Sequence, residues 1–99
     1  MPKYSIVIPA YNEAKRLGSS LERVGNYVTT QRWDAEVIVV NDGSHDGTPE
    51  LVLQCAQRYP FMRLIENPGN RGKGYSVRNG MMHASGDLLL FSDADLSAP

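Results

Sequence analysis

Two carboxylates separated by one residue, Asp93 and Asp95, directly follow the apolar run Leu88–Phe91 and Ser92. In extended backbone, residues two positions apart project to the same side, so these side chains would converge. Mg²⁺ and Mn²⁺ prefer oxygen ligands, and Mg²⁺ is commonly shared between carboxylates and substrate phosphates. The pair therefore predicts a metal–diphosphate site at the carboxyl end of a central strand. An exposed acidic turn would have the same sequence, and Asp-x-Asp taken alone favours that turn.

The run before this pair, Leu88–Phe91, has no polar residue at alternate positions, so we predict a strand buried on both faces. Three earlier segments rich in apolar residues predict further strands. These are Tyr4–Ile8, Ala35–Val40 and Phe61–Ile65. Pro9 has no backbone N–H to donate to a sheet, so it fits the end of the first strand.

Helical patterns separate the first three strands. A first helix from about Glu13 to Thr30, with Asn12 as its candidate N-cap, is predicted by apolar residues spaced to share one face. Those residues are Leu17, Leu21, Val24 and Val28. A second helix is predicted to start at Thr48, which would cap it with its hydroxyl group ahead of Pro49, and to stop at Pro60.

A third helix is predicted from Lys73 to Ala84, with Met81 on its packed side and Gly86 as its terminator. Other residues have side chains that could serve catalysis or binding, but we predict structural or surface roles for them. Packing is predicted for Cys55, Trp33, Met81 and Met82, surface positions for His45 and His83, and solvated positions for Arg71 and Arg78.

The alternation of four strands and three helices predicts an α/β fold with a Rossmann-like, doubly wound and mostly parallel sheet. We infer the strand order 3-2-1-4, which reverses between the first and fourth strands. Ligands of such sheets bind outside the carboxyl ends of the strands at that reversal. This order would bring together four carboxylates from three separate segments. They are Glu13, Asp42, Asp93 and Asp95.

Composition narrows the possible functions. The 99 residues are 41% hydrophobic, which suffices for one small domain spanning residues 1–99. A net charge of −1 gives no indication of nucleic-acid binding. The single cysteine, Cys55, excludes an internal disulfide and a cysteine-rich zinc site. No apolar run approaches the roughly 18 residues of a membrane span, and the N-terminus lacks a signal-peptide pattern.

Three alternative functions are excluded by the identity or spacing of the residues that they require. Gly72-Lys73-Gly74 is not a phosphate loop, because glycine follows the lysine and the upstream glycine spacing is wrong. A dinucleotide fingerprint fails because position 77 is valine. A phospho-acceptor receiver domain would need acidic residues directly after the first strand, where this chain has Pro9-Ala10-Tyr11. Tyr11 is the one aromatic residue predicted to be functional, because of the loop that carries it.

Four blocks of sequence resemble the inverting family-2 glycosyltransferases of GT-A fold. They are Ser5–Glu13, Val39–Thr48, Asn70–Gly74 and Asp93–Asp95. Within that family, the segments around Arg71–Met81 and Asp93–Ser97 look most like the dolichyl- and polyprenyl-phosphate β-glucosyltransferases, followed by dolichyl-phosphate mannose synthases. The resemblance covers essentially all 99 residues, but only the nucleotide-binding half of such an enzyme.

The resemblance implies roles for individual residues. Asp42 would bind the base, Asp93 would face the ribose and phosphate, and Asp95, together with Asp93, would hold Mg²⁺ or Mn²⁺ against the diphosphate. Lys73 would add a positive charge near the nucleotide. The base and ribose pocket would be lined by Pro9, Ala10, Tyr11 and Glu13. UDP-glucose is the implied donor, with GDP-mannose second, and a polyprenyl phosphate is the implied acceptor.

The same resemblance implies a second half that carries the acceptor pocket and the catalytic base, in an enzyme that is cytoplasmic and membrane-associated. We therefore expect this chain to be truncated after Asp95, so that no catalytic residue is assigned and the chain does not turn over alone. The alternative is a nucleotide-binding or purely structural fragment. We also expect the strand Leu88–Phe91 to lie at an exposed edge, through which the fragment self-associates by edge pairing or domain swapping.

Overall fold

A computed structural model of the protein describes residues 2–92 and shows one parallel sheet of four strands. The strands have the order β3-β2-β1-β4, so the predicted order and the doubly wound α/β fold are confirmed. The elements in chain order are β1 (Tyr4–Ala10), α1 (Ala14–Thr30), β2 (Ala35–Asn41), α2 (Thr48–Arg58), β3 (Met62–Glu66), α3 (Lys73–His83) and β4 (Leu88–Phe91). The predicted metal ligands Asp93 and Asp95 lie outside the described residues.

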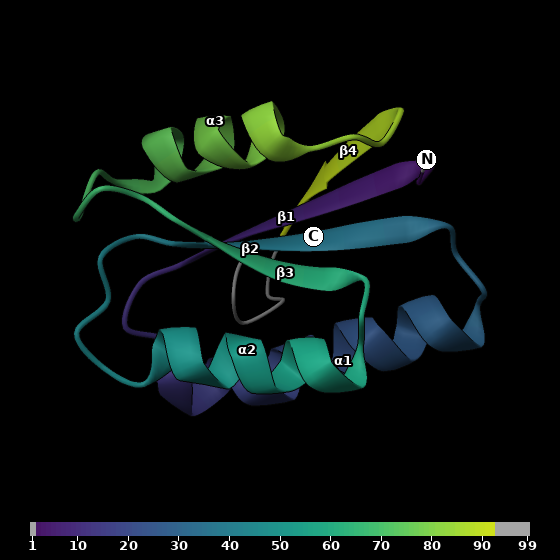
Figure 1. The fold of residues 1–99 in the computed structure, drawn as a ribbon, viewed down its shortest axis with the longest axis horizontal. Helices are drawn as coiled ribbons and strands as arrows, with labels where there is room; N and C mark the ends of the chain where they lie inside the picture. Colours follow the sequence, from purple (N-terminus) through teal and green to yellow (C-terminus); the bar gives the residue numbers. More distant parts are fainter. Residues whose placement is uncertain (1, 93–99) are drawn as a thin grey trace.

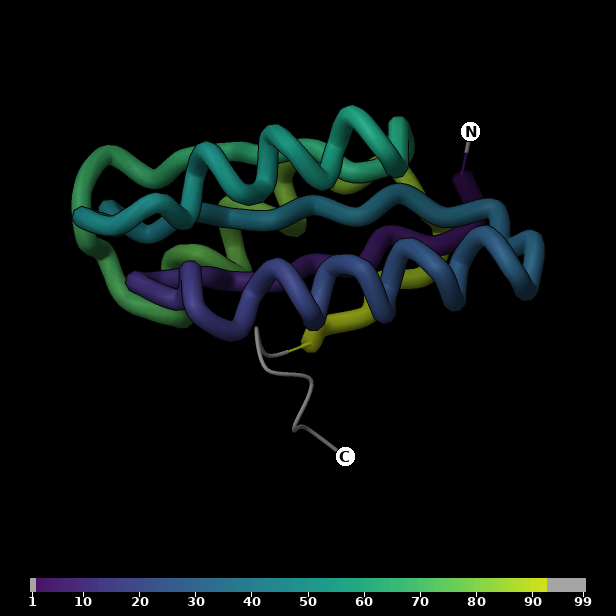
Figure 2. Tube along the Cα trace, turned by 90° about the horizontal axis from the view of Figure 1, so that it is seen from below, coloured from purple at the N-terminus to yellow at the C-terminus, as the bar shows by residue number. Residues whose placement is uncertain are grey.

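Helices cover both faces of the sheet (Figure 1). The helices α1 and α2 lie side by side against one face, and α3 crosses the other (Figures 1 and 2). Alternate residues of β1 pack against the helices on opposite faces of the sheet, because successive side chains of a strand point to opposite faces. Ile6 and Ile8 pack in the cluster with α1 and α2, whereas Val7 packs with Ile38 and Val40 on the α3 side. The two central strands therefore supply both cores.

The helix α3 approaches the sheet with small residues. Ser76 and Gly80 are its buried positions, and a Cβ added at Gly80 would lie 2.4 Å from a methyl group of Val7. The prediction that Met81 and Met82 are packing residues is wrong, since their side chains are 45% and 79% exposed. The close approach leaves room for serine and glycine against the sheet and turns both methionines outward.

The strand β4 forms where predicted but is not buried on both faces. It pairs with β1 alone among the described strands, and Leu88, Leu90 and Phe91 are each at least 39% exposed. The expected exposure of this strand at an edge is confirmed by the strand order. An unbroken apolar run identifies a strand, but it does not report how many neighbours cover it.

Three predicted helix boundaries differ from the structure. The N-cap of α1 is Glu13, and Asn12 instead adopts a left-handed conformation with φ of 50°. Thr48 is the first residue of α2 and Gly47 its N-cap, because the Thr48 hydroxyl group donates to Asp46 instead of accepting from the helix. Gly86 does not terminate α3, which ends at His83.

A polar clamp fastens the start of β4 at the amino edge of the sheet. The Oε2 atom of Glu36 accepts hydrogen bonds from the Ser5 hydroxyl group at 2.6 Å and from the N–H and hydroxyl groups of Ser85 at 2.6 and 2.9 Å. The N–H of Gly86 donates in turn to the Ser5 hydroxyl oxygen at 2.8 Å. One carboxylate on β2 thus ties β1 to the segment that enters β4.

Candidate functional site

The carboxyl ends of the central strands bring three loops together. Ala10 and Asn41 are register partners at the ends of β1 and β2, and the N–H of Asp42 donates to the Ala10 carbonyl oxygen at 2.9 Å. The N–H of Asn67 donates to the Asn41 carbonyl oxygen at 2.9 Å, which brings the loop after β3 to the same edge. Beyond β4, the N–H of Ser92 donates to the Val7 carbonyl oxygen at 3.1 Å. The edge is the one at which ligands of doubly wound sheets bind.

Asp42 stands at the centre of this edge and is only 5% exposed. Its Oδ1 atom accepts from the Asn67 side-chain amide at 2.8 Å and from the N–H of Arg71 at 2.7 Å, and its Oδ2 atom accepts from the N–H of Gly72 at 2.9 Å. Burial raises the pKa of Asp42, but these hydrogen bonds and the Arg71 charge outweigh it and hold the pKa below its ordinary value of 3.8. The carboxylate is therefore ionised at neutral pH.

A buried amide supports that carboxylate from the α3 side. The Asn67 side-chain amide also donates to the Ser76 hydroxyl oxygen at 2.8 Å, and its Oδ1 atom accepts from the Asn79 side chain at 2.9 Å. The Ser76 hydroxyl group donates to the Gly72 carbonyl oxygen at 3.0 Å. Among the described residues, no buried side-chain nitrogen or oxygen lacks a hydrogen-bond partner.

The loop after β2 packs directly against the backbone of the loop after β3. Gly43 has φ of 74°, and a Cβ added there would lie 2.7 Å from the Asn70 nitrogen and 2.8 Å from the Gly69 carbonyl carbon. The Asn70 side chain donates to the Asp42 carbonyl oxygen at 3.2 Å. Glycine is required at position 43 for both its conformation and this contact.

The loop after β1 is fastened to the same β2 loop. The N–H of Asn12 donates to the Ser44 hydroxyl oxygen at 3.0 Å, and the Asn12 side chain accepts from the N–H of His45 at 2.8 Å. The N–H of Glu13 donates to the Thr48 hydroxyl oxygen at 3.2 Å. Asn12 therefore joins two loops, which is a different role from the helix cap predicted for it.

At this edge α1 and α2 share one capping residue. The Asp46 carboxylate accepts from the N–H of Ala14, the first residue of α1, at 3.2 Å. It also accepts from the N–H of Thr48 at 3.0 Å and from the Thr48 hydroxyl group at 2.5 Å. The first two loops are thus linked, because their helices are capped by the same side chain.

The described site residues predicted from sequence all lie at this edge. Tyr11 is 44% exposed and available to a ligand, whereas Ala10 is 2% exposed and has its carbonyl group engaged by Asp42. The Glu13 carboxylate is paired with Arg16 at 2.7 Å. Pro9 is half-buried within β1, and Lys73 is exposed at the start of α3, next to Gly72. The predicted segments after β1 and β2 come together as the inferred topology required, whereas the third, which carries Asp93 and Asp95, lies outside the described residues.

Sequence reasoning missed the residues that hold these loops in place, Asn67 and Asp46. Asp46 lies two residues before Thr48, and an aspartate just before a helix is a capping signal that was available. Asn67 had no such signal, because an asparagine beside Pro68 and Gly69 is typical of any turn. Its partners Ser76 and Asn79 are separated from Asp42 by more than 30 positions and meet it only in the folded chain.

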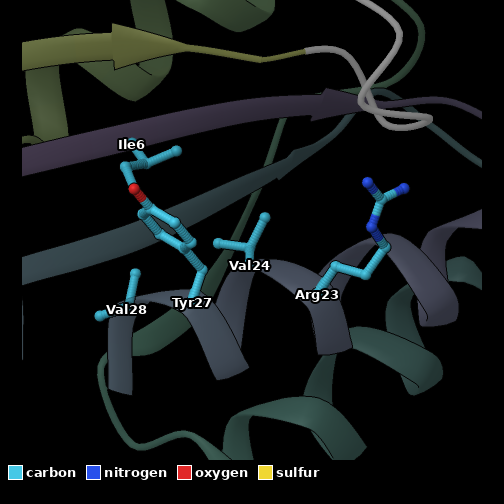
Figure 3. Close-up of a pocket in the computed structure, with 5 residues that line it drawn as sticks. All are labelled: Ile6, Arg23, Val24, Tyr27 and Val28. Carbon is cyan, nitrogen blue, oxygen red and sulfur yellow. The ribbon is translucent and has the colours of Figure 1, made fainter. Parts of the chain in front are cut away.

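A cavity of about 280 Å³ lies away from this edge, between α1 and the middle of β1. Figure 3 shows the Tyr27 ring reaching from α1 toward Ile6, with Val24 and Arg23 along the same helix. Its lining is largely apolar and brings together no set of groups suited to acid–base or metal chemistry. Within residues 2–92, no cluster of three or more histidine, cysteine or acidic side chains is placed to hold a metal ion.

Comparison with known proteins matches this architecture to one family. The profile of Glycosyl transferase family 2 matches residues 5–99. A dolichyl-phosphate beta-glucosyltransferase of Trichomonas vaginalis is 43% identical over 96 residues, which cover 92% of this chain and 30% of that protein. The Mus musculus dolichyl-phosphate beta-glucosyltransferase is 42% identical over 98 residues, with 92% and 30% covered. The chain thus spans about 30% of the length of these relatives.

Solved structures agree with the sequence matches. A mannosyltransferase from Pyrobaculum calidifontis in complex with GDP-Man and Mn²⁺ has a TM-score of 0.82 and 32% identity, with 95% of this chain and 28% of that chain covered. Staphylococcus aureus TarS in complex with UDP has a TM-score of 0.80 and 26% identity, with 94% and 27% covered. None of the helices within residues 2–92 is both long enough and apolar enough to cross a membrane.

Proposed function

Because the chain belongs to glycosyl transferase family 2, we propose that it forms the donor-binding part of an inverting enzyme that transfers glucose from UDP-glucose to a polyprenyl phosphate. The observation that carries this proposal is the joining of three loops at the carboxyl edge around the ionised Asp42. Relatives named dolichyl-phosphate beta-glucosyltransferases, 42–44% identical over most of the chain, support glucose and the lipid acceptor.

The state of Asp42 supports uridine as the nucleoside. A carboxylate offers about four acceptor positions, and protein donors within residues 2–92 take two on Oδ1 and one on Oδ2. The remaining position on Oδ2 suits the single imide N–H of uracil. Guanine presents two adjacent N–H donors, which are best met by both oxygens of one carboxylate. A GDP-mannose donor is the second candidate, favoured by the structural similarity to the mannosyltransferase bound to GDP-Man.

The other residues of the edge have roles in holding the nucleotide. Tyr11 is exposed where a base or ribose would lie against its ring. Lys73 is exposed beside the loop that contacts Asp42 and supplies a positive charge for the diphosphate. Pro9, Ala10 and Glu13 shape the pocket through backbone and packing, since Ala10 is buried and Glu13 is paired with Arg16.

A divalent metal, Mg²⁺ or Mn²⁺, belongs to the proposed function. Asp93 and Asp95 would hold it, because carboxylate oxygens are the ligands these hard cations prefer and both residues follow Ser92, which is still paired with β1. A bound metal neutralises charge on the leaving nucleoside diphosphate. Structural relatives are bound to Mn²⁺ together with nucleotides or nucleotide sugars, which supports this assignment.

The acceptor pocket and catalytic base would come from residues beyond those described, in an enzyme that works at the cytoplasmic face of a membrane. No described residue is assigned as the base. A nucleotide-binding or structural fragment without catalysis is the alternative reading of this chain.

The proposal is tested by calorimetric titration of UDP and of GDP into the chain, each with and without Mn²⁺. We expect Mn²⁺-dependent binding of UDP, lost in Asp95→Ala and kept in the control Asp87→Ala, whose carboxylate is exposed before β4. Mn²⁺-dependent binding of GDP instead would favour the mannose donor. Absence of binding under every condition would contradict donor binding by this chain.

We also propose that β4 mediates self-association with a second copy of the chain, by edge pairing or domain swapping. Within residues 2–92 the outer side of β4 has no strand beside it, and its four residues carry neither charge nor proline to block pairing. Leu90 is the register partner of Ile6, so the two side chains lie on the same face of the sheet, and Ile6 also lines the cavity in Figure 3.

Sedimentation velocity over a range of concentrations tests this second proposal. We expect wild-type chain to form dimers, and Leu88→Lys or Leu90→Lys to shift it toward monomers because a charge on the edge opposes pairing. The control Leu53→Lys changes a leucine of similar exposure on α2 and should leave association unchanged. A wild-type monomer at high concentration would contradict association through β4.

A further inference from the structure

We propose that Asn67 is a positioning residue that orients the Asp42 carboxylate toward the base, and that it acts together with Ser76 and Asn79 of α3. The inference rests on the proposed function, because it concerns the same nucleotide site. Asn67 reaches Asp42 through its side-chain amide at 2.8 Å, in a contact buried from solvent.

The Asn67 amide is fixed in one orientation by its three partners. Its NH₂ group donates both hydrogens, to Asp42 Oδ1 and to the Ser76 hydroxyl oxygen. Its carbonyl oxygen accepts from the Asn79 side-chain NH₂ group. A flipped amide would face the carboxylate with an oxygen and the Asn79 donor with a nitrogen, so two favourable contacts would become repulsive. The direction of donation to Asp42 is therefore determined by the network.

The network is anchored at both ends. Asn67 is 7% exposed, and its backbone N–H continues the pairing of β2 and β3 by donating to the Asn41 carbonyl oxygen. Ser76 is fully buried on the face of α3 that meets the sheet, and its hydroxyl group donates to Gly72. A chain of side-chain hydrogen bonds thereby connects α3 to the carboxylate.

This support determines which acceptor of Asp42 is left for a ligand. Asn67 and the Arg71 N–H fill Oδ1, and the Gly72 N–H takes one position on Oδ2. Without the Asn67 donor, Oδ1 regains an acceptor position and the carboxylate can rotate. Such a carboxylate offers both oxygens, which is the arrangement that guanine needs. Asn67 thus favours a base with one N–H donor, such as uracil, over a base with two, such as guanine. It does so through Asp42 and without contacting the base itself.

The charged group that acts on Asp42 from the described elements is Arg71, so the network and this guanidinium together set the ionisation of the carboxylate. A role confined to stability would lower the unfolding midpoint and leave both base preference and ionisation unchanged. A positioning role changes them. The variant Asn26→Ala is a matched control, because Asn26 also makes a side-chain hydrogen bond, but on α1, where it accepts from the Tyr59 hydroxyl group.

The experiment measures two quantities in wild type, Asn67→Ala, Asn79→Ala and Asn26→Ala. The first is the Kd of UDP and of GDP with Mn²⁺, and the second is the pKa of Asp42 from ¹³C carboxyl chemical shifts without nucleotide. In Asn67→Ala we expect the UDP Kd to rise by roughly tenfold or more, the GDP Kd to rise less, and the Asp42 pKa to rise. Asn79→Ala should change the Kd values and the Asp42 pKa in the same direction but by less, and Asn26→Ala should change neither.

Each outcome decides the inference. A UDP-to-GDP ratio and an Asp42 pKa that stay at their wild-type values in Asn67→Ala would overturn it. If circular dichroism shows Asn67→Ala to be unfolded, the milder Asn79→Ala decides in the same way. If wild-type chain binds neither nucleotide, the proposed function fails for this chain. In that case an Asp42 pKa that rises in Asn67→Ala but not in Asn26→Ala still supports the positioning role, and an unchanged pKa overturns it.

Discussion

The Asp46 carboxylate accepts a hydrogen bond at 3.2 Å from the backbone N–H of Ala14, which lies 32 residues earlier in the chain. The same carboxylate caps α2 through Thr48. An N-cap acceptor usually serves the helix that follows it directly, whereas Asp46 serves that helix and a second one. Two helix N-termini, each with a partial positive charge, are thus stabilised by a single negative side chain.

Removing this carboxylate should destabilise the fold through both helices. We expect Asp46→Ala to lower the urea unfolding midpoint because both helix starts lose an acceptor. Asp46→Asn should have a smaller effect, since its amide oxygen can still serve Thr48 while its NH₂ group cannot accept from Ala14. Asp34→Ala, which removes another exposed aspartate, is the control. Equal midpoints for Asp46→Ala and Asp34→Ala would contradict the shared cap.

The Asp46 contribution should also depend on pH. The hydrogen bond from the Thr48 hydroxyl group is the largest influence, and together with the backbone N–H donors it holds the pKa of Asp46 below its ordinary value of 3.8. A lowered pKa stabilises the fold above the ordinary value, and the stabilisation is lost as pH falls through the lower folded value. The difference in unfolding midpoint between wild type and Asp46→Asn should therefore shrink in acid. A difference that grows in acid would contradict this sign.

Two glycines of α1 should respond to alanine in opposite directions. A Cβ at Gly25 would lie 2.7 Å from ring atoms of Tyr59, whose hydroxyl group is held by Asn26. Overpacking of about 1–3 kcal/mol should exceed the helix-propensity gain of about 1 kcal/mol, so Gly25→Ala should destabilise. A Cβ at Gly18 would make an ordinary 3.4 Å contact with Leu51. Gly18→Ala should therefore stabilise by about 0.5–1 kcal/mol in denaturant titrations.

The contact between the second and third loops can be isolated with two other glycines. Gly43 and Gly69 both have positive φ, of 74° and 86°, so alanine at either position meets a conformational cost of about 1–2 kcal/mol. Only the Cβ at position 43 would also collide with backbone, because nothing lies within 4 Å of a Cβ at position 69. Gly43→Ala should be the less stable variant and should weaken UDP binding. Similar stability and affinity of the two variants would argue against close loop contact.

The clamp on β4 should open in acid. Burial raises the pKa of Glu36, but the hydrogen bonds from Ser5 and Ser85 outweigh it and hold the pKa below the ordinary value of 4.5. The stabilisation is present above 4.5 and is lost as pH falls through the lower folded value. We expect Glu36→Gln to speed hydrogen exchange of the β4 amides at neutral pH, after correction for intrinsic rates. The control Glu50→Gln, an exposed residue of α2, should leave those rates unchanged.

The strand order and the edge that carries the site followed from local patterns, because buried β-branched runs, helical periodicity and short connections leave few topologies. The burial of individual apolar side chains did not follow from these patterns. Leu88–Phe91 and Met81 are apolar by type, yet their burial depends on what lies beside them, and that is settled by the approach of Gly80 to Val7 and by the position of β4 at an edge.

The residues that hold the site together also could not be predicted from local sequence patterns. Asn67 meets Asp42 across 25 positions, and Asn12 meets His45 across 33. Such contacts have no periodicity, and an asparagine in a turn is explained equally well by turn geometry alone. The described residues among those named from family resemblance lie at the edge, whereas the residues that fix them were visible only in the folded chain.

The backbone contact at Gly43 also constrains how this scaffold can be recombined. Residues 41–48 and 67–72 fit one another without an intervening side chain, and the Asp42 carboxylate is held by donors from the second segment. A chimera with a breakpoint between these two segments would take them from different proteins, and their loop surfaces would not be matched to each other. Under the proposed function, exchanging the base preference with that of another scaffold would require both segments to be transplanted together, as a single cassette made of two pieces of sequence.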